Sequence, residues 1–290
     1  MNFSKSVIDI IQQRFSCRKY ESKSIDESIL NKLQEAIISL PKPPFGSSLR
    51  FLLVASSQPD SLALHKLGTY GFIKNPAGFI IGAASHGLKN LEDFGFQMEL
   101  LILYATDLGL GTCWLGGSFN RSSFAKKINL GSFEEIPAVS SIGLILCEDV
   151  AKKSFIRRLA KSDFRLSWQE LFFDGKFGNP LEKKVAEPFA QALEMVRIGP
   201  SASNKQPWRI LKQGQKWHFY LKRTKGYHDN LLVKLLKISD MQRVDMGIAM
   251  CHFALTLKEL GINGTWSIED PKIITNDSLT EYSATWTPNE

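Results

Sequence analysis

Apolar positions recur at helical spacing in some segments of the chain and form short continuous runs in others. Val7, Ile10 and Ile11 share one face of a helix that we predict over residues 3–14. The same spacing predicts further helices at 24–39, 91–109, 181–197 and 241–260. Short apolar runs predict strands at 50–56, 77–84, 137–147, 208–213 and 217–222. This mixture of helices and strands indicates an α+β chain.

The order of predicted elements occurs twice, and residue identities recur with it. The matching residues are Glu35 and Glu194, Pro41 and Pro200, and Arg50 and Arg209 at an offset of 159, then Asp93 and Asp245, Met98 and Met250, and Trp114 and Trp266 at an offset of 152. The change of offset corresponds to a connection that is seven residues shorter in the second copy. We therefore predict two copies of one unit, residues 1–175 and 176–290, that form one composite body.

Length and composition are those of an ordinary globular protein. The chain has 290 residues, of which 43% are hydrophobic and 22% charged, so wholesale disorder is excluded. The most apolar stretch, residues 98–117, is interrupted by Glu99 and Asp107 and is not a membrane span. The N-terminal segment carries Asp9 and lacks the long apolar run of a secretory signal. These features predict a soluble cytoplasmic protein.

The net charge of +7 lies entirely in the second part of the chain. Residues 1–150 hold 14 basic and 14 acidic residues, whereas residues 151–290 hold 22 and 15. Such an excess indicates either a solvated basic face or an anionic partner. The anionic partner could be nucleic acid, a membrane surface or a phosphorylated small molecule. No basic run is long enough, or interleaved with aromatics regularly enough, to resemble a nucleic-acid module, and we expect neither a nucleic-acid nor a membrane partner.

Cysteine and histidine patterns do not predict a metal centre. The cysteines are Cys17, Cys113, Cys147 and Cys251, and none forms a C-x-x-C pair. The five histidines are scattered and do not form H-E-x-x-H or a similar pattern. We predict mostly buried, reduced thiols and no metal.

A first candidate binding segment combines Arg14, Ser16 and Arg18. Two guanidinium groups and a hydroxyl within five residues suit a phosphate, which arginine can bind with two parallel hydrogen bonds. The alternative is a solvated helix end. The aligned segment of the second copy, residues 173–178, reads FFDGKF and lacks this cluster.

A second candidate segment, residues 199–208, reads GPSASNKQPW. Its hydroxyls and carboxamides can contact the edge of a flat polar heterocycle, although an Asx-rich turn is the alternative. The first copy has Phe45 where the second has Asn204, and Leu49 where the second has Trp208. Each half therefore retains what the other has lost, which predicts one composite site.

A third segment, residues 109–117, reads GLGTCWLGG and follows a predicted helix. Trp114 occupies the position of the third glycine in G-x-G-x-x-G, so a Rossmann dinucleotide site is not indicated. The glycines either allow backbone N–H groups to approach a ligand or form a helix C-cap and turn.

Together, these three segments resemble those of the nitroreductase-like FMN oxidoreductases. The R-x-S-x-R helix end, the P-S-x-x-N-x-Q-P-W loop and the L-G-L-G-T-x-W turn match in type and order, over most of the chain. Members of that family are usually homodimers with FMN at the subunit interface. The internal repeat resembles such a dimer fused into one chain. The resemblance therefore implies a nitroreductase-like fold of helices around a mainly antiparallel sheet, in a monomer acting as a pseudo-dimer.

The resemblance also implies a set of FMN-binding residues. They are Arg14, Phe15, Ser16 and Arg18 in the phosphate segment, Trp114, Leu115, Gly116 and Gly117 against the flavin, and Pro200, Ser201, Ala202 and Asn204 near the ring or ribityl chain. A late basic residue is expected at the phosphate, either Arg165 or the less favoured Lys161. Gly116 stands where an acidic residue is common in the family.

The activity implied by the resemblance is NAD(P)H-dependent reduction of a small acceptor such as a nitroaromatic or a quinone. Hydride would pass to FMN N5 and then to the acceptor, because the cofactor carries the chemistry and the protein supplies orientation and electrostatics. No side chain is assigned a catalytic proton transfer. Two alternatives remain: a non-catalytic flavin-binding or storage protein, and a binder of nucleic acid or acidic surfaces.

Overall fold

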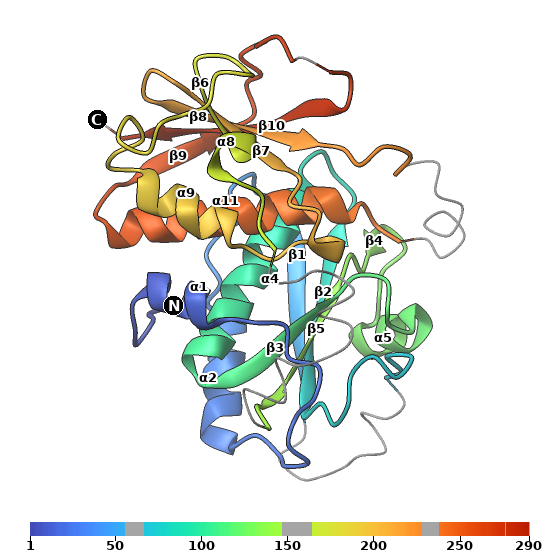
Figure 1. Cartoon of the computed structure of the whole chain (residues 1–290). Helices are drawn as coiled ribbons and strands as arrows, with labels where there is room; N and C mark the ends of the chain where they lie inside the picture. Colours follow the sequence, from blue (N-terminus) through green and yellow to red (C-terminus); the bar gives the residue numbers. More distant parts are fainter. Residues whose placement is uncertain (56–66, 147–163, 228–237, 276, 290) are drawn as a thin grey trace.

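The computed structural model describes residues 1–55, 67–146, 164–227, 238–275 and 277–289. Two β-sheets lie toward opposite ends of the molecule, and two long helices, α4 (Asn90–Asp107) and α11 (Met241–Glu259), pack against each other between them (Figure 1). Helix α9 (Ala190–Arg197) lies beside α11. The helical layer therefore separates the two sheets.

The first sheet is built entirely from the first half of the chain. Its strands are β1 (Leu49–Ala55), β2 (Gly78–Ser85), β3 (Leu110–Leu115), β4 (Glu134–Glu135) and β5 (Val139–Leu144). Their order is β1-β2-β5-β3, and β4 pairs with β2. All of these pairings are antiparallel. Helices α1 (Val7–Gln13), α2 (Glu27–Ile38) and α5 (Arg121–Ile128) complete this half.

The second sheet repeats this arrangement. Its strands are β6 (Phe172–Asp174), β7 (Trp208–Gln213), β8 (Lys216–Lys222), β9 (Gly264–Ser267) and β10 (Thr280–Pro288), in the order β6-β7-β8-β10-β9. Apart from β6, which pairs parallel with β7, the order along both sheets is first, second, last, third strand. In both halves the long helix connects the second strand to the third. The predicted α+β class is confirmed. The boundary near residue 175 stays a prediction, and β6 lies just before it.

Alternating side chains of β8 show why this segment forms a strand. Trp217, Phe219 and Leu221 are buried in the core between the second sheet and α11, where Phe253 packs against Phe219 with ring centroids 5.3 Å apart. Period-two alternation gives a strand one apolar face, and burial of that face against a helix is the main stabilising term. A short helix, α8 (Trp168–Leu171), adds Trp168 to the same core.

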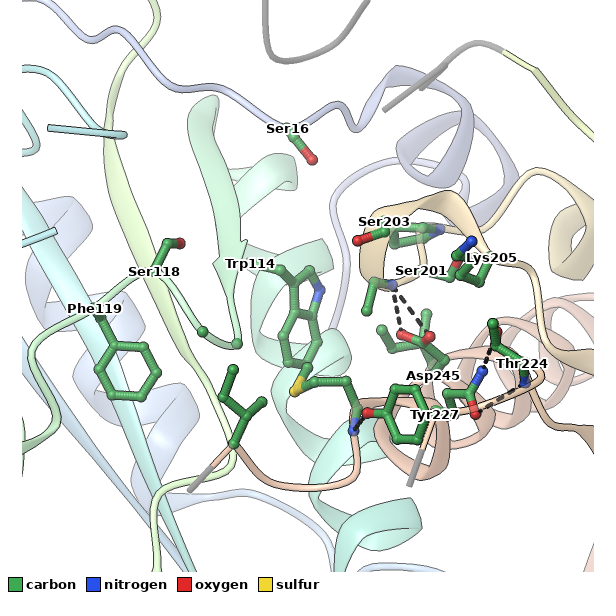
Figure 2. Close-up of a pocket in the computed structure, with 18 of the residues that line it drawn as sticks. Ser16, Trp114, Ser118, Phe119, Ser201, Ser203, Lys205, Thr224, Tyr227 and Asp245 are labelled. Carbon is green, nitrogen blue, oxygen red and sulfur yellow. Dashed lines mark hydrogen bonds between the residues drawn. The ribbon is translucent and has the colours of Figure 1, made fainter. Parts of the chain in front are cut away.

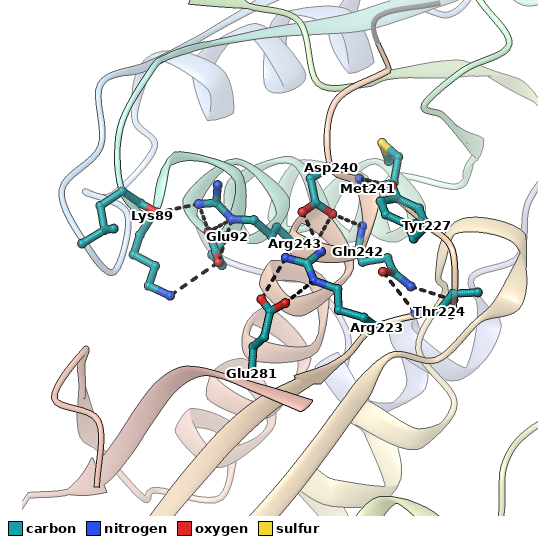
Figure 3. A network of polar contacts seen from close by, with 11 residues as sticks. Lys89, Glu92, Arg223, Thr224, Tyr227, Asp240, Met241, Gln242, Arg243 and Glu281 are labelled. Carbon is teal, nitrogen blue, oxygen red and sulfur yellow. Dashed lines mark hydrogen bonds and ion pairs between the residues drawn. The ribbon is translucent and has the colours of Figure 1, made fainter. Parts of the chain in front are cut away.

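Ion pairs join the start of α11 to its surroundings (Figure 3). Arg243 donates to the Glu92 carboxylate of α4 at 2.6 Å and to the Leu88 carbonyl oxygen at 2.6 Å. Asp240, the N-cap of α11, accepts from Arg223 at 2.6 Å. Arg223 also contacts Glu281 of β10 at 3.0 Å. Buried and half-buried charges thus tie α11 to α4 and to the second sheet.

Two predicted segments differ from the structure. Helix α9 begins only at Ala190, and residues 181–189 form turns. Residues 110–115, within the expected glycine-rich loop or turn, form strand β3, because β5 supplies their hydrogen-bond partners along its whole length. Gly111 allows β3 to lie close to Cys17. A Cβ at position 111 would be 3.0 Å from both Cβ and Sγ of Cys17. Tertiary pairing overrides the local preference of glycine.

Within the described ranges, no helix is both long enough and apolar enough to cross a membrane. Cys17, Cys113 and Cys251 are buried. Cys147 lies outside the described residues.

Candidate functional site

A pocket of about 1240 Å³ lies between the two halves (Figure 2). Both halves contribute to its wall. The lining includes Ser16, Arg18, Trp114, Gly116, Gly117 and Arg121 from the first half, and Pro200, Ser201, Ala202, Lys205, Tyr227 and Asp245 from the second. In Figure 2 the Trp114 indole lies between the Ser118 loop on one side and the contact of Asp245 with the Ser201–Ala202 backbone on the other.

The segment after α1 brings Ser16 and Arg18 to the pocket. This segment runs beside β3, because Ser16 bridges Thr112 and the Cys17 backbone N–H donates to the Thr112 carbonyl oxygen at 2.8 Å. Nη1 of Arg18 is buried, and among the described residues it has no hydrogen-bond partner. Buried polar groups are almost always hydrogen-bonded. An anionic ligand group would satisfy this guanidinium nitrogen.

Arg14 and Phe15 do not line the pocket. The Arg14 side chain is 6% exposed, and its Nε lies 3.8 Å from Oε1 of Glu99 on α4. Phe15 packs against the core of the first half. The structure thus separates Arg14 from Ser16 and Arg18 by pairing it with a buried carboxylate, and its role at a phosphate stays a prediction.

The turn after β3 is shaped by packing against the second half. A Cβ on Gly116 would lie 2.6 Å from Sδ of Met241, and one on Gly117 would lie 2.9 Å from Cδ1 of Ile238. Leu115 is buried and does not line the pocket. The two glycines therefore let the second half approach, which is a packing reason in addition to the one expected from sequence.

Arg121 fixes the orientation of this turn. Its Nη2 donates to the Gly116 carbonyl oxygen at 3.1 Å, and its Nη1 donates to the Ile136 carbonyl oxygen at 2.6 Å. The guanidinium lies 4.9 Å from the centroid of the Phe119 ring. Burial lowers the pKa of Arg121 from its usual value. Arginine side chains are not deprotonated in proteins. Arg121 thus adds a permanent positive charge to the pocket.

The loop of the second half is fixed by an aspartate of α11. The Ala202 backbone N–H donates to both carboxyl oxygens of Asp245, at 2.9 and 3.1 Å. Ser201 Oγ accepts from the Gln206 backbone N–H at 2.8 Å. Pro200, Ser201 and Ala202 thereby line the pocket. Desolvation raises the pKa of Asp245 well above its usual value, because one N–H donor compensates burial only in part.

Asn204 and Arg165 hold the same loop from outside the pocket. Arg165 Nε and Nη2 donate to the Ile198 carbonyl oxygen at 3.1 and 2.9 Å, and its Nη1 lies 3.4 Å from Asn204 Oδ1. Asn204 Nδ2 donates to the Phe164 carbonyl oxygen at 2.9 Å. Neither side chain lines the pocket, so ligand contacts by Asn204 and Arg165 stay predictions. Lys161 lies outside the described residues.

Several lining residues were not found by motif, although the internal repeat contained a signal for one of them. Asp93, the repeat partner of Asp245, accepts the backbone N–H groups of Phe45 and Ser47 at 3.0 and 2.9 Å. An aspartate that repeats at an offset of 152 therefore marks the residue that clamps the loop in each half. The other missed lining residues, which lack any local pattern, include Tyr70, Phe72, Thr224, Lys225 and Tyr227.

The chemistry of the pocket suits a planar anionic ligand. Its described lining includes four cationic side chains, Arg18, Arg121, Lys205 and Lys225, against the single carboxyl group of Asp245. Trp114 and Phe119 add aromatic surface. In the part of the chain that the structure describes, no group of three or more His, Cys, Asp or Glu side chains is arranged to hold a metal ion.

Comparison with solved structures gives similar folds. A "putative nitroreductase" from Thermotoga maritima MSB8 is 19% identical, with 99% of this chain and 95% of that chain covered and a TM-score of 0.59. A nitroreductase with bound FMN from Desulfitobacterium hafniense DCB-2 is 16% identical and covers 50% of this chain and 91% of its own, with a TM-score of 0.40. Comparison with curated proteins gives no match.

A protein-family model with the description "Putative TM nitroreductase" matches residues 6–257, which include every described residue that lines the pocket. The match begins at the N-cap of α1 and ends within α11, so it spans both halves. The chain therefore belongs to this nitroreductase family.

Proposed function

We propose that the protein is an FMN-dependent oxidoreductase that binds a single FMN in the composite pocket. The observation that carries the proposal is the meeting of two segments in one cavity, Ser16–Arg18 from the first half and Pro200–Ala202 from the second. Each segment occurs in only one copy of the repeat. Membership of the nitroreductase family supports the same function.

The residues present fit FMN. The buried Nη1 of Arg18 and the Ser16 hydroxyl suit its phosphate, since a charged acceptor would satisfy the arginine nitrogen. Trp114 and the Gly116–Gly117 turn on one side, and the Pro200–Ala202 loop on the other, would hold the ring system. At about 1240 Å³ the cavity exceeds the roughly 300–1,000 Å³ typical of ligand sites, which leaves room for a second reactant.

When bound, FMN would supply hydride transfer from NAD(P)H to a small acceptor such as a nitroaromatic or quinone. The protein's contribution is orientation. Arg121 fixes the Gly116 carbonyl group and Asp245 fixes the Ala202 backbone, so a hydrogen-bonding side chain holds each wall of the pocket. No side chain of the pocket is assigned a proton transfer in this proposal.

One FMN per chain is expected, in a monomer that acts as a pseudo-dimer. At the corresponding place of the other half, Phe45 packs against the core of the second half. In the first copy, Phe45 stands where Asn204 stands, and the loop around it lacks the Pro-Ser-Ala-Ser-Asn sequence of residues 200–204. The second site of the ancestral arrangement would therefore be lost, whereas the first is retained.

The test is the visible absorption spectrum of the purified protein after reconstitution with FMN, followed by anaerobic addition of NADH or NADPH. We expect one flavin per chain and bleaching of its visible absorption when the nucleotide reduces it. A protein that FMN cannot reconstitute would overturn the proposal. Bound flavin that neither nucleotide bleaches would instead indicate a flavin-binding protein without this activity, and two flavins per chain would contradict the lost site.

A further inference from the structure

A chain of hydrogen bonds runs from Trp114 in one wall of the pocket to the helix that precedes the loop of the other wall. Trp114 Nε1 donates to Glu99 Oε2 at 2.7 Å, and Glu99 Oε1 lies 2.9 Å from His252 Nε2. His252 Nδ1 lies 2.9 Å from the Met195 carbonyl oxygen. The side chains of Glu99 and His252 are both fully buried. The hydrogen bonds therefore lead from β3 through α4 and α11 to α9, and the side chains of Glu99 and His252 in the middle have no contact with solvent.

The partners determine where the hydrogens lie. The Met195 carbonyl oxygen can only accept, so His252 Nδ1 carries a hydrogen. The contact between His252 Nε2 and Glu99 then requires one more hydrogen, on either the ring or the carboxyl group. Each of these hydrogen-bonding groups, from Trp114 to Met195, thereby has a partner. The position of the Trp114 indole is therefore specific.

The hydrogen bonds end at Met195, close to the pocket loop of the second half. Met195 lies in the last turns of α9, and the part of the loop that lines the pocket begins three residues after this helix ends, at Pro200. A Cβ on Gly199 would lie 3.4 Å from His252 Nδ1, so the imidazole ring packs directly beneath the start of this loop.

The repeat shows that the fold does not need this carboxylate. At the offset of 152, Cys251 stands where Glu99 stands, and Trp266 stands where Trp114 stands. Trp266 packs on the rings of Phe219 and Phe253, with centroids 5.0 and 6.3 Å away. Burying a carboxylate is strongly unfavourable unless it is paired. The first half, whose Trp114 lines the pocket, buries the Glu99 carboxylate despite this cost. The second half has the uncharged Cys251 at the same position.

We propose that Glu99 and His252 are positioning residues that hold the Trp114 indole against the pocket loop and thereby set the affinity for the flavin. This inference rests on the proposed function because its ligand is FMN, whereas the contacts among Glu99, His252 and Trp114 do not depend on that function. Arg14 belongs to the same group of contacts, since its Nε lies 3.8 Å from the Glu99 carboxylate.

The substitutions Glu99→Gln and Glu99→Ala separate hydrogen bonding from charge. Glutamine can accept from the Trp114 indole through its oxygen and donate to His252 Nε2 through its amide, so it preserves the chain. Alanine leaves the indole N–H without this acceptor. We expect Glu99→Ala to weaken FMN binding by about tenfold and Glu99→Gln by about twofold or less. Glu92→Ala is the matched control, because Glu92 is also a buried carboxylate of α4 that binds α11, at Arg243 (Figure 3).

A double-mutant cycle with Trp114→Phe tests whether Glu99 acts through Trp114. In the Trp114→Phe background, Glu99→Ala should change the FMN dissociation constant by only about twofold. An equal loss in both backgrounds would overturn the proposal, as would an equal loss in Glu92→Ala.

The contact itself can be tested in the protein without flavin. The indole ¹H–¹⁵N signal of Trp114, assigned with Trp114→Phe, should exchange slowly with solvent in the original protein and in Glu99→Gln but not in Glu99→Ala. If the protein binds no FMN, the proposed function fails, while this signal still decides whether Glu99 holds the indole. An indole signal unchanged by Glu99→Ala would overturn the positioning role in either case.

Discussion

Gly95 of α4 and Gly247 of α11 meet where the two long helices cross. A Cβ on Gly95 would lie 3.1 Å from Cα of Gly247 and would collide with the Val244 carbonyl group. A Cβ on Gly247 would collide with the Glu92 carbonyl oxygen and would lie 2.7 Å from the Phe96 backbone nitrogen. The two glycines are related by the offset of 152, so the same residue of each copy allows the close approach of both helices.

Substitution of either crossing glycine should separate the helices. Gly95→Ala and Gly247→Ala each place a methyl group against backbone atoms that cannot rotate away, so each should destabilise the fold by about 3 kcal/mol or more. The free energy of unfolding from urea titration checks this. Gly87→Ala is the control, since its Cβ would meet only the Asn90 side chain at 3.9 Å. Equal effects at all three positions would contradict the assigned crossing.

Arg18 should discriminate FMN from riboflavin. If its buried Nη1 binds the phosphate, Arg18→Gln removes a charged hydrogen bond worth about 1.5–3 kcal/mol, which is about tenfold or more in affinity. Riboflavin, which lacks the phosphate, should lose little. Dissociation constants from quenching of flavin fluorescence measure both. The neighbouring Lys19→Gln is the control, because Lys19 is exposed and does not line the pocket. An equal loss for the two flavins would exclude a phosphate contact.

Asp245 should make stability fall as pH rises. Burial raises its pKa in the folded protein above the ordinary value of 3.8, so the folded state binds this proton more tightly than the unfolded state. Stability from this group is complete below that ordinary value and is lost as pH rises through the folded pKa. Asp245→Asn keeps an acceptor for the Ala202 N–H, so it should be more stable than the original protein at about pH 8 but not at about pH 4. If urea titration gave the same difference in the free energy of unfolding between the two proteins at both pH values, the prediction would be contradicted.

The corresponding substitution in the first half should have the opposite sign at neutral pH. Burial raises the pKa of Asp93 as well, but Asp93 accepts two backbone N–H groups, those of Phe45 and Ser47, one on each oxygen, and both oppose this rise. The substitution Asp93→Asn leaves one acceptor oxygen, so one buried N–H group would face an amide donor, at a cost of about 1–3 kcal/mol. Thermal unfolding at neutral pH should show a lower midpoint for Asp93→Asn and a higher one for Asp245→Asn. Equal shifts would show that both aspartates serve only as loop clamps.

The C-terminal end of α5 should lose stability in acid. Arg50 donates to the Ile128 and Asn129 carbonyl oxygens at 2.6 and 2.9 Å and to Glu134 at 2.7 Å. Arg50 lowers the pKa of Glu134 to about 2. A lowered pKa means that the stabilisation is present above the ordinary value of 4.5 and is lost as pH falls toward 2. Glu134→Gln should flatten the stability profile between these values, by a small amount because the pair is partly exposed. An unchanged acid profile would contradict the assigned pair.

Local patterns in the sequence determined most elements and the duplication. The sequence pattern predicted α11 and β7 nearly residue for residue, because the preference of a segment for helix or strand depends on its own neighbouring residues. The repeated Asp-x-Gly of residues 93–95 and 245–247 predicted two related helices, and the structure has them crossing at those glycines. Ser16, Arg18, Trp114 and Pro200–Ala202 were also predicted, and they line one cavity.

Only the tertiary structure decided which side chains face that cavity and which support it. Arg14 pairs with Glu99, and Asn204 binds the Phe164 carbonyl oxygen, although both belong to segments whose neighbours line the pocket. Glu99 and His252 are 153 residues apart and meet through the packing of α4 on α11. A sequence pattern specifies the conformation of a segment because its determinants are local. The partner of a buried polar group is set by long-range packing, which must satisfy every such group at once.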